Sequence, residues 1–162
     1  MTDEHDEGSI HAHPPVFAAV RIDQFQPHEA EHLLAIWLVA SRLGHPFLSE
    51  EDLAAQRDLV RDVYLPQAET WVIRRGDEIA GFIGLLDNFI GGLFIDPVLH
   101  GQGLGRALID HARRLKGRLA VEAYEANASA VGFYRQCGFV EVGRRERDDE
   151  GRSLPLIRLE QE

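Results

Sequence analysis

Three glycines alternate with other residues over 100–106, in the segment His-Gly-Gln-Gly-Leu-Gly-Arg. The segment follows an apolar run typical of a strand and precedes a run with helical periodicity. Such a turn exposes backbone N–H groups beside the positive end of a helix, and both attract phosphate. A dinucleotide fingerprint would need glycine where the chain has Arg106 or Leu108, and no P-loop Gly-Lys-Ser/Thr follows. The sequence therefore predicts an anion-binding turn, with a tight connection that binds nothing as the alternative.

Arg106 lies in the first turn of the expected helix, where its positive charge opposes the helix dipole. A bound anion would offset that cost, which favours the anion-binding interpretation.

A second group of residues that could do chemistry is Asn127, Ala130 and Tyr134. Their i, i+3, i+7 spacing places them on one face of a helix, with an amide at one end and a phenol two turns along. The alternative is an asparagine that caps the helix and a tyrosine that packs in the core.

A third pattern, His28-Glu29-Ala30-Glu31-His32, has the H-E-x-x-H spacing of zinc metalloproteases. At about 100° per residue, both histidines point away from the apolar stripe of the same helix. No third ligand is evident downstream. We therefore interpret the pattern as the polar face of a helix. A zinc hydrolase is kept as the third and least favoured of the functions considered for this chain.

The elements that must position these residues alternate along the chain in the order β-α-α-β-β-β-α-β-α-β-β. The second helix is expected to begin at a Ser49 cap and to end near Tyr64, before Pro66. This pattern predicts an α/β (α+β) fold in which a mixed sheet carries helices on both faces. Strands are expected over 16–23, 71–75, 78–86, 89–95, 118–124, 139–147 and 152–160, and helices over 27–44, 49–64, 104–117 and 127–138.

Length and composition bound the class of protein. The chain has 162 residues, of which 44% are hydrophobic, and a formal net charge of −10. We expect one domain over 15–162 after a flexible tail over 1–14. The acidic balance argues against nucleic-acid binding, and no apolar run approaches the roughly 20 residues of a membrane span. The single cysteine, Cys137, excludes a disulfide within the chain and suits the cytoplasm.

Taken together, segments 100–106 and 127–139 resemble the two signature motifs of the GNAT superfamily of acyl-CoA-dependent N-acetyltransferases. The resemblance covers nearly all of 16–160, including the order of the strands. It is strongest to the small bacterial YjaB-like branch, through the segments 45–49, 93–97 and 130–134.

The resemblance implies a mostly antiparallel sheet of about seven strands, splayed at a bulge in the strand over 89–95. Acetyl-CoA would lie in the opening, with its pantetheine arm on the backbone near Phe94 and Ile95. Asn127 would contact that arm, and Tyr134 would reach the thioester sulfur as the catalytic acid. The pyrophosphate would lie on the turn and the helix start, at His100, Gly101, Gln102, Gly103, Leu104, Gly105 and Arg106.

Two departures from the superfamily pattern matter. The phosphate turn usually opens with Gln or Arg, whereas this chain has His100. Many relatives carry a carboxylate base on the splayed strand, where this chain has Gly91 and Gly92, so the base is not identified. The candidates on the acceptor side are His45, Asp87 and Glu122 as bases and Phe47 as a pocket wall.

These observations predict transfer of an acetyl group from acetyl-CoA to a primary amine of a small molecule or peptide, by direct attack in a ternary complex. A catalytically idle acyl-CoA-binding or sensing module on the same fold is the alternative. The acidic composition favours a cationic acceptor. No metal, nucleic-acid or membrane partner is expected, and pairing through the last strands could give a homodimer.

Overall fold

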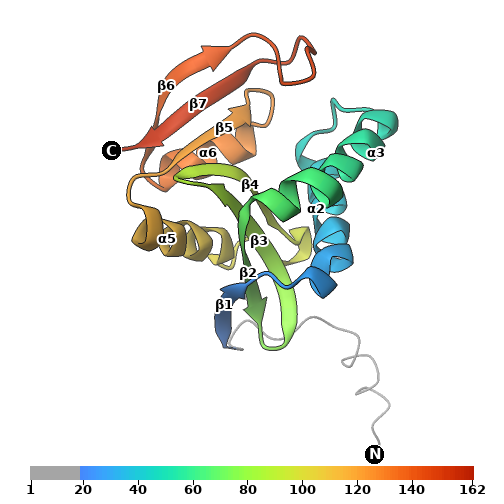
Figure 1. Cartoon of the computed structure of the whole chain (residues 1–162). Coiled ribbons are helices and arrows are strands. Elements are labelled where there is room, and N and C mark those ends of the chain that lie inside the picture. The colour runs from blue at the N-terminus through green and yellow to red at the C-terminus, as the bar shows by residue number, and fades with distance from the viewer. Residues whose placement is uncertain (1–18) are drawn as a thin grey trace, which may run out of the picture.

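The seven expected strands pair into one sheet in the structure, a computed structural model that describes residues 19–162. Their order across the sheet is β1-β2-β3-β4-β5-β7-β6, as Figure 1 shows. The tail predicted over 1–14 lies outside the described residues. The strands are β1 Val20–Gln24, β2 Glu69–Arg75, β3 Glu78–Leu86, β4 Phe89–Ile95, β5 Ala120–Tyr124, β6 Phe139–Arg145 and β7 Leu156–Gln161.

The sheet opens between β4 and β5, the two strands that pair in parallel. Their pairing stops after two residues, at Phe89 with Ala120 and Ile90 with Val121. At this point Gly91 bulges out of β4, because Ile90 lies opposite Leu85 while Gly92 lies opposite Gly84. A bulge bends its strand and increases the local twist, so β4 turns away from β5. The other neighbouring strands are antiparallel. The mostly antiparallel sheet and its bulge in the strand over 89–95 are therefore confirmed.

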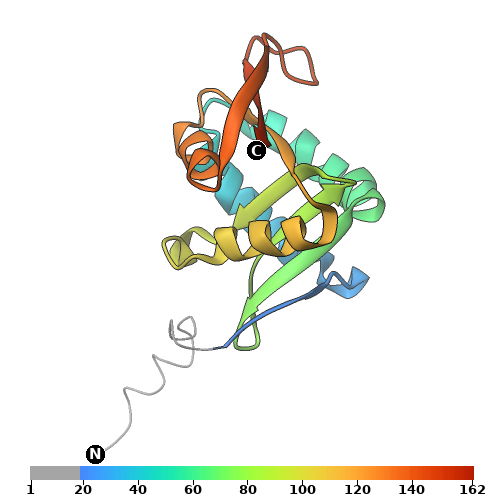
Figure 2. The ribbon, with the colours of Figure 1, turned by 90° about the vertical axis from the view of Figure 1, so that its left-hand side faces the viewer.

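Helices cover both faces of the sheet, as the sequence predicted, because side chains of the central strands alternate between the faces. Val72 and Phe82 pack on one face with Leu34 of α2. Ile73 packs on the opposite face with Leu108 of α5. Figure 2 looks onto this second face and shows α5 lying across the strands. The helical segments are η1 Pro27–Glu29, α2 Ala30–Gly44, α3 Glu50–Leu59, η2 Val60–Tyr64, α4 Leu65–Gln67, η3 Pro97–Leu99, α5 Leu104–Lys116 and α6 Ala128–Gln136.

The second helix begins as predicted and ends later than predicted. The Ser49 hydroxyl accepts a hydrogen bond from the Asp52 N–H at 2.9 Å, so it caps α3. The prediction that the helix stops before Pro66 was wrong, since helical structure continues through η2 and α4. Within the π-turn η2, the Leu65 N–H bonds to the Val60 carbonyl, one residue farther back than in an α-helix. This wider turn accommodates the proline ring, which would clash with a carbonyl in a regular helix.

Among residues 19–162, no helix is both long and apolar enough to cross a lipid bilayer.

Candidate active site

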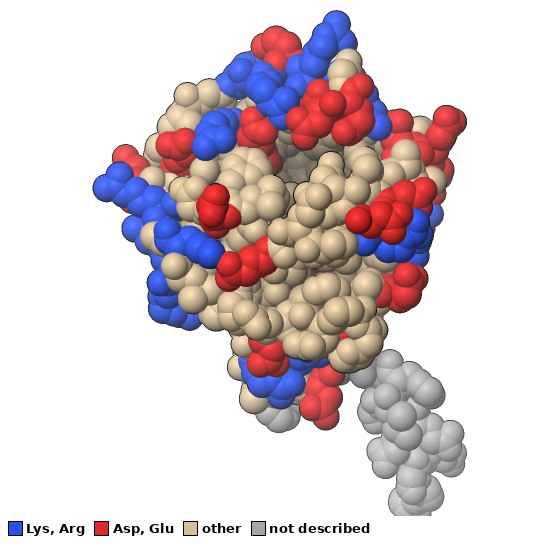
Figure 3. Space-filling model, in the orientation of Figure 1, with Lys and Arg blue, Asp and Glu red and all other residues tan. Residues whose placement is uncertain are grey.

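The opening between β4 and β5 holds a cavity of about 1160 Å³. Its wall includes parts of β3, β4 and β5, the glycine turn, α6, the end of α2, the helical segments α3, η2 and α4, and the loop over 146–155 that joins β6 to β7. Figure 3 shows a hollow on the face seen in Figure 1, with charged side chains gathered along its upper rim. The volume exceeds the 300–1,000 Å³ typical of a pocket for one drug-sized ligand, so two substrates can meet in it.

The glycine turn exposes its backbone to this cavity. Gly101 and Gly103 have φ values of +82° and +77°, and no atom lies within 4 Å of where a Cβ would stand on either. Gly103 is also the N-cap of α5, and no side chain caps that end of the helix. The first N–H groups of a helix lack intrahelical partners, so this end presents free donors together with the positive pole of the dipole. The turn thus has both the space and the donors that a diphosphate requires.

Gly105 serves a different purpose from the two glycines before it. A Cβ at Gly105 would stand 3.0 Å from the Phe133 ring on α6. Glycine here lets α5 and α6 pack closely beside the cavity. Leu104 is buried in the core and also lines the cavity, whereas Gln102 is not part of the cavity wall.

The two basic side chains of the turn already have partners within the chain. His100 Nε2 lies 3.1 Å from the Ile95 carbonyl oxygen, which can only accept, so Nε2 carries the proton of that bond. His100 can then donate a second hydrogen bond, through Nδ1, only when its ring is charged. Arg106 donates to the carbonyl of Gln136, the last residue of α6, at 2.7 Å. The negative end of the α6 dipole offsets the unfavourable interaction between Arg106 and the positive end of its own helix. A bound anion is therefore not required to explain an arginine at this position.

One edge of β4 is open toward the cavity beyond the bulge. The Asp96 N–H bonds to the Ala80 carbonyl of the β3 side. Because peptide groups alternate along an antiparallel strand, Phe94 pairs with β3 and the peptide groups of Leu93 and Ile95 face the opening. An extended amide-containing arm could therefore pair with the Leu93 peptide groups and with the Ile95 N–H, while the Ile95 carbonyl already accepts from His100. Phe94 instead contributes its ring, which packs against Phe82.

Asn127 and Tyr134 both lie on the cavity wall, as their shared helix face predicted. The Asn127 Oδ1 caps α6 by accepting the Ala130 N–H at 3.2 Å, which confirms the capping interpretation. Its Nδ2 stands 3.0 Å from where a Gly44 Cβ would be, so α2 and α6 meet here. Tyr134 is buried and packs against Phe133 and Phe139. Burial raises the pKa of Tyr134 well above its ordinary value, so the phenol keeps its proton at neutral pH.

The acceptor-side candidates separate into different environments. His45 lines the cavity and packs in a three-ring cluster with Phe47 and Tyr124. Burial lowers the pKa of His45 to about 4, so its ring is neutral and weakly basic at pH 7. Phe47 does not line the cavity and packs behind His45 against the α2 core. Asp87 also lies outside the cavity wall, because it occupies the β3–β4 turn with φ +55°.

Glu122 of β5 lines the cavity and is engaged by Arg145 of β6. Arg145 Nε and Nη2 lie 3.0 and 2.9 Å from the two Glu122 carboxylate oxygens. The same Nη2 lies 3.1 Å from an oxygen of Asp149. Arg145 was not among the expected site residues, because nothing local to 139–147 indicates which of its arginines faces the cavity.

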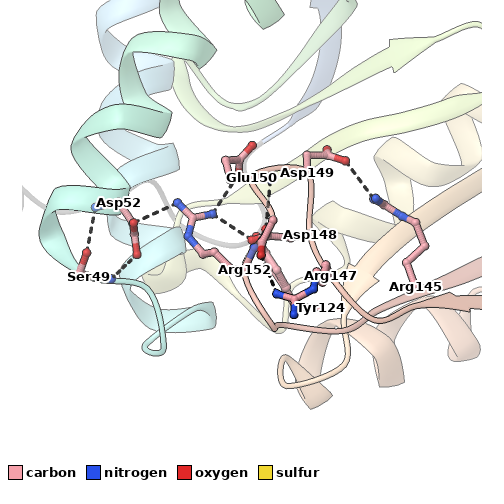
Figure 4. A network of polar contacts seen from close by, with 10 residues as sticks. Ser49, Asp52, Tyr124, Arg145, Arg147, Asp148, Asp149, Glu150 and Arg152 are labelled. Atoms are coloured by element: carbon pink, nitrogen blue, oxygen red, sulfur yellow. Dashed lines mark hydrogen bonds and ion pairs between the residues drawn. The ribbon is translucent and has the colours of Figure 1, made fainter.

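Sequence analysis also missed a polar network that joins the β6–β7 loop to α3 (Figure 4). The buried Asp148 carboxylate accepts from the Tyr124 hydroxyl and from Arg152, each at 2.9 Å. Arg152 also donates to Asp52 at the start of α3, 100 residues away along the chain. Burial of Asp148 opposes its ionisation, but Arg152 and the surrounding donors hold the pKa of its carboxyl below the ordinary value. From the sequence, residues 148–151 are only the gap between the strands expected over 139–147 and 152–160.

The H-E-x-x-H segment does not form a metal site in the structure. His28 and His32 are exposed, and the Glu29 carboxylate is paired with Arg74. Over residues 19–162, no three His, Cys, Asp or Glu side chains are grouped in a way that could hold a metal ion.

Comparison with known proteins agrees with this geometry. The profile of the acetyltransferase (GNAT) domain matches residues 66–141. The chain is 40% identical to the peptidyl-lysine N-acetyltransferase YjaB of Salmonella typhimurium over 86% of its length and 97% of that protein. It is 31% identical to the peptidyl-lysine N-acetyltransferase YiaC of Escherichia coli, over 73% of this chain and 82% of YiaC.

Solved structures show the same fold. The solution structure of apo YjaB from Escherichia coli aligns with a TM-score of 0.81 at 39% identity, over 88% of this chain and 97% of that one. The PaiA N-acetyltransferase of Thermoplasma acidophilum, solved with coenzyme A, aligns with a TM-score of 0.72 at 14% identity, over 89% and 99% of the two chains. The splayed sheet, the glycine turn and these similarities lead to one assignment: the chain belongs to the GNAT family of acetyltransferases.

Proposed function

We propose that the acceptor of this acetyl-CoA-dependent N-acetyltransferase is the ε-amine of a lysine in a protein or peptide. The observation that carries the proposal is that a single cavity is lined by both the glycine turn and a set of acidic side chains. Those acids are Glu122, Asp148, Asp149 and Glu150. These four acids outnumber the two arginines on the same wall, Arg106 and Arg145, so the wall favours a cationic side chain. The relatives YjaB and YiaC are named peptidyl-lysine N-acetyltransferases.

The donor half of the cavity would hold acetyl-CoA mainly through backbone groups. The N–H groups at Gly101, Gly103 and the start of α5 suit the pyrophosphate, and Leu93 and Ile95 suit the amides of the pantetheine arm. Asn127 keeps its Nδ2 for that arm while its Oδ1 caps α6. When bound, acetyl-CoA supplies the thioester that the acceptor amine attacks.

The reaction needs a free amine and a stabilised leaving sulfur. The amine nitrogen bonds to the acetyl carbon as the carbon–sulfur bond breaks, the nitrogen loses a proton and the sulfur gains one. At a lysine pKa of ~10.4, only one amine in ~2,500 is unprotonated at pH 7, a deficit of ~4.6 kcal/mol. Tyr134 would donate a hydrogen bond to the sulfur, since its buried hydroxyl, with a raised pKa, carries its proton at neutral pH.

Of the three side chains considered as bases, Glu122 suits the incoming amine best. Asp87 lies outside the cavity wall, and a His45 ring with a pKa of about 4 binds a proton weakly at pH 7. Glu122 lies on the wall and accepts from a cation in the structure. We assign it the contact with the acceptor ammonium, and we assign His45 and Tyr124 to the cavity wall.

The function is tested by acetyl-CoA binding and then by thiol release in the same samples. Calorimetry should show binding, and a peptide with one free lysine should release thiol. The matched control is the same peptide with that ε-amine already acetylated, and this peptide should not release thiol. Release from both peptides would contradict lysine acetylation. Binding without release would favour the idle acyl-CoA module, and absence of binding would refute the donor site.

We also propose that the protein acts in the cytoplasm, which its single cysteine favours. A homodimer through the last strands would use β6, the outer strand of the sheet.

A further inference from the structure

Arg145 spans β7 to reach Glu122, and the contact faces the cavity. Two parallel N–H···O contacts of 3.0 and 2.9 Å join the guanidinium to both carboxylate oxygens. Side-chain exposures of 41% for Arg145 and 22% for Glu122 place the pair on the wall, where solvent and ligands reach it. Such pairs are weak enough to exchange for another cation.

A bulge in β6 determines that Arg145, and not its neighbour Arg144, takes this place. Val142 is the extra residue, because Glu141 lies opposite Leu159 while Gly143 lies opposite Arg158. Beyond the bulge, Arg145 lies opposite Leu156, which itself lies opposite Tyr124. Directly opposed residues share a face, so Arg145 is on the same face as Glu122 and Tyr124. Without the extra residue, Arg144 would occupy that face.

The cavity acids differ in whether they can accept a new partner. Asp148 receives the Tyr124 hydroxyl, the Arg152 guanidinium and the backbone N–H groups of Glu150 and Arg152. Its lone pairs are filled, and it is buried. In the part of the chain that the structure describes, both oxygens of Glu122 are bound by the single guanidinium of Arg145. Glu122 becomes available as soon as that one cation leaves.

We infer that Arg145 is a specificity-determining residue whose guanidinium occupies the place of the acceptor ammonium on Glu122. The inference rests on the proposed function and extends it. An acceptor must compete with Arg145 for Glu122, so cationic amines enter and neutral groups do not displace the guanidinium. The released guanidinium keeps its contact with Asp149 at the mouth of the cavity, 3.1 Å away in the structure. No bond is made or broken in this exchange.

The experiment measures initial rates of thiol release with a single-lysine peptide as acceptor. Arg145→Gln is expected to lower the acceptor KM three- to ten-fold, with kcat and the acetyl-CoA KM within two-fold of wild type. Glu122→Gln is expected to raise the acceptor KM at least ten-fold. In the double variant, the gain from Arg145→Gln should vanish, because the carboxylate for which the two cations compete is gone.

Arg144→Gln is the matched control. Arg144 is the preceding residue of β6, has the same 41% exposure and also pairs with two acids, Glu125 and Glu146. It does not line the cavity, so its variant should keep the wild-type acceptor KM. A raised or unchanged acceptor KM in Arg145→Gln would overturn this inference but not the proposed function, since turnover would still support lysine acetylation. Absence of turnover in wild type and in every variant would overturn both proposals.

Discussion

The two halves of the cavity are built by different means. The donor half is a continuous stretch of backbone, from the open edge of β4 through the glycine turn into α5. The acceptor half is made of side chains that come from the end of α2, from α3 and η2, from β5, from β6 and from the β6–β7 loop. His45 and Asp148, for example, are separated by about a hundred residues and meet through Tyr124.

This difference explains how each half recognises its substrate. Backbone donors are the same whatever side chains surround them, so a short glycine pattern is enough to specify a diphosphate site. A side-chain wall depends on which residues the sheet brings together, and it can change from one relative to the next without disturbing the fold. The donor half therefore carries the chemistry of the family, and the acceptor half carries the choice of amine. Four substitutions test this contrast.

The largest effect is expected from Gly103→Val in the donor half. A β-branched side chain at φ +77° strains the turn and fills the space where phosphate would lie. Calorimetry should find acetyl-CoA binding abolished. Gly117→Val is the control, because Gly117 has φ +82° at the far end of α5. It should lose stability and keep binding; equal loss of binding in both variants would contradict a local phosphate site.

Tyr134→Phe should lower kcat ten- to a thousand-fold and leave the acetyl-CoA KM nearly unchanged. The hydroxyl acts on the sulfur as it leaves, whereas the ring continues to pack with Phe133 and Phe139. Steady-state rates of thiol release measure both constants. Wild-type turnover in this variant would remove Tyr134 from the mechanism.

Asp148→Asn should lower the free energy of unfolding by about 1.5–3 kcal/mol, because the buried carboxylate loses its charge-assisted contact with Arg152, while Asp52 and Glu150 still pair with that guanidinium. Denaturant unfolding gives the change in stability, and the acceptor KM should rise while acetyl-CoA binding persists. Asp149→Asn is the control, since Asp149 is 72% exposed and should change stability by less than about 0.5 kcal/mol. Loss of acetyl-CoA binding in Asp148→Asn would show that the halves are not independent.

The smallest effect concerns the pH dependence of stability through His45. The folded ring has a pKa of about 4, whereas an unfolded histidine titrates near 6.5. Below pH 6.5 the unfolded chain binds a proton that the folded chain does not. The free energy of unfolding therefore decreases as the pH is lowered. Between pH 7 and pH 5 we expect a loss of about 1–2 kcal/mol through this group. Unfolding at both pH values should show a smaller loss in His45→Gln; an identical loss would contradict the buried neutral ring.

Much of the donor half could be predicted from the sequence because its determinants are local. The alternating glycines, the following helix and the asparagine cap of α6 each depend on residues within a few positions. Predictions failed where a local sequence rule was overridden by the conformation of a neighbouring turn or by contacts with residues distant in the sequence. The chain stays helical past Pro66 because a π-turn makes room for the ring, and Arg106 is compensated by the end of α6, 30 residues away.

The sequence by itself determined the order of elements, the glycine turn and the shared helix face of Asn127 and Tyr134. Only the tertiary structure decided that Glu122 meets Arg145 and that Asp148 is buried with Tyr124 and Arg152. The physical reason is that side chains in strands alternate with a period of two. One extra residue at Val142 exchanges the faces of Arg144 and Arg145, and where a strand admits such a residue depends on its partner across the sheet.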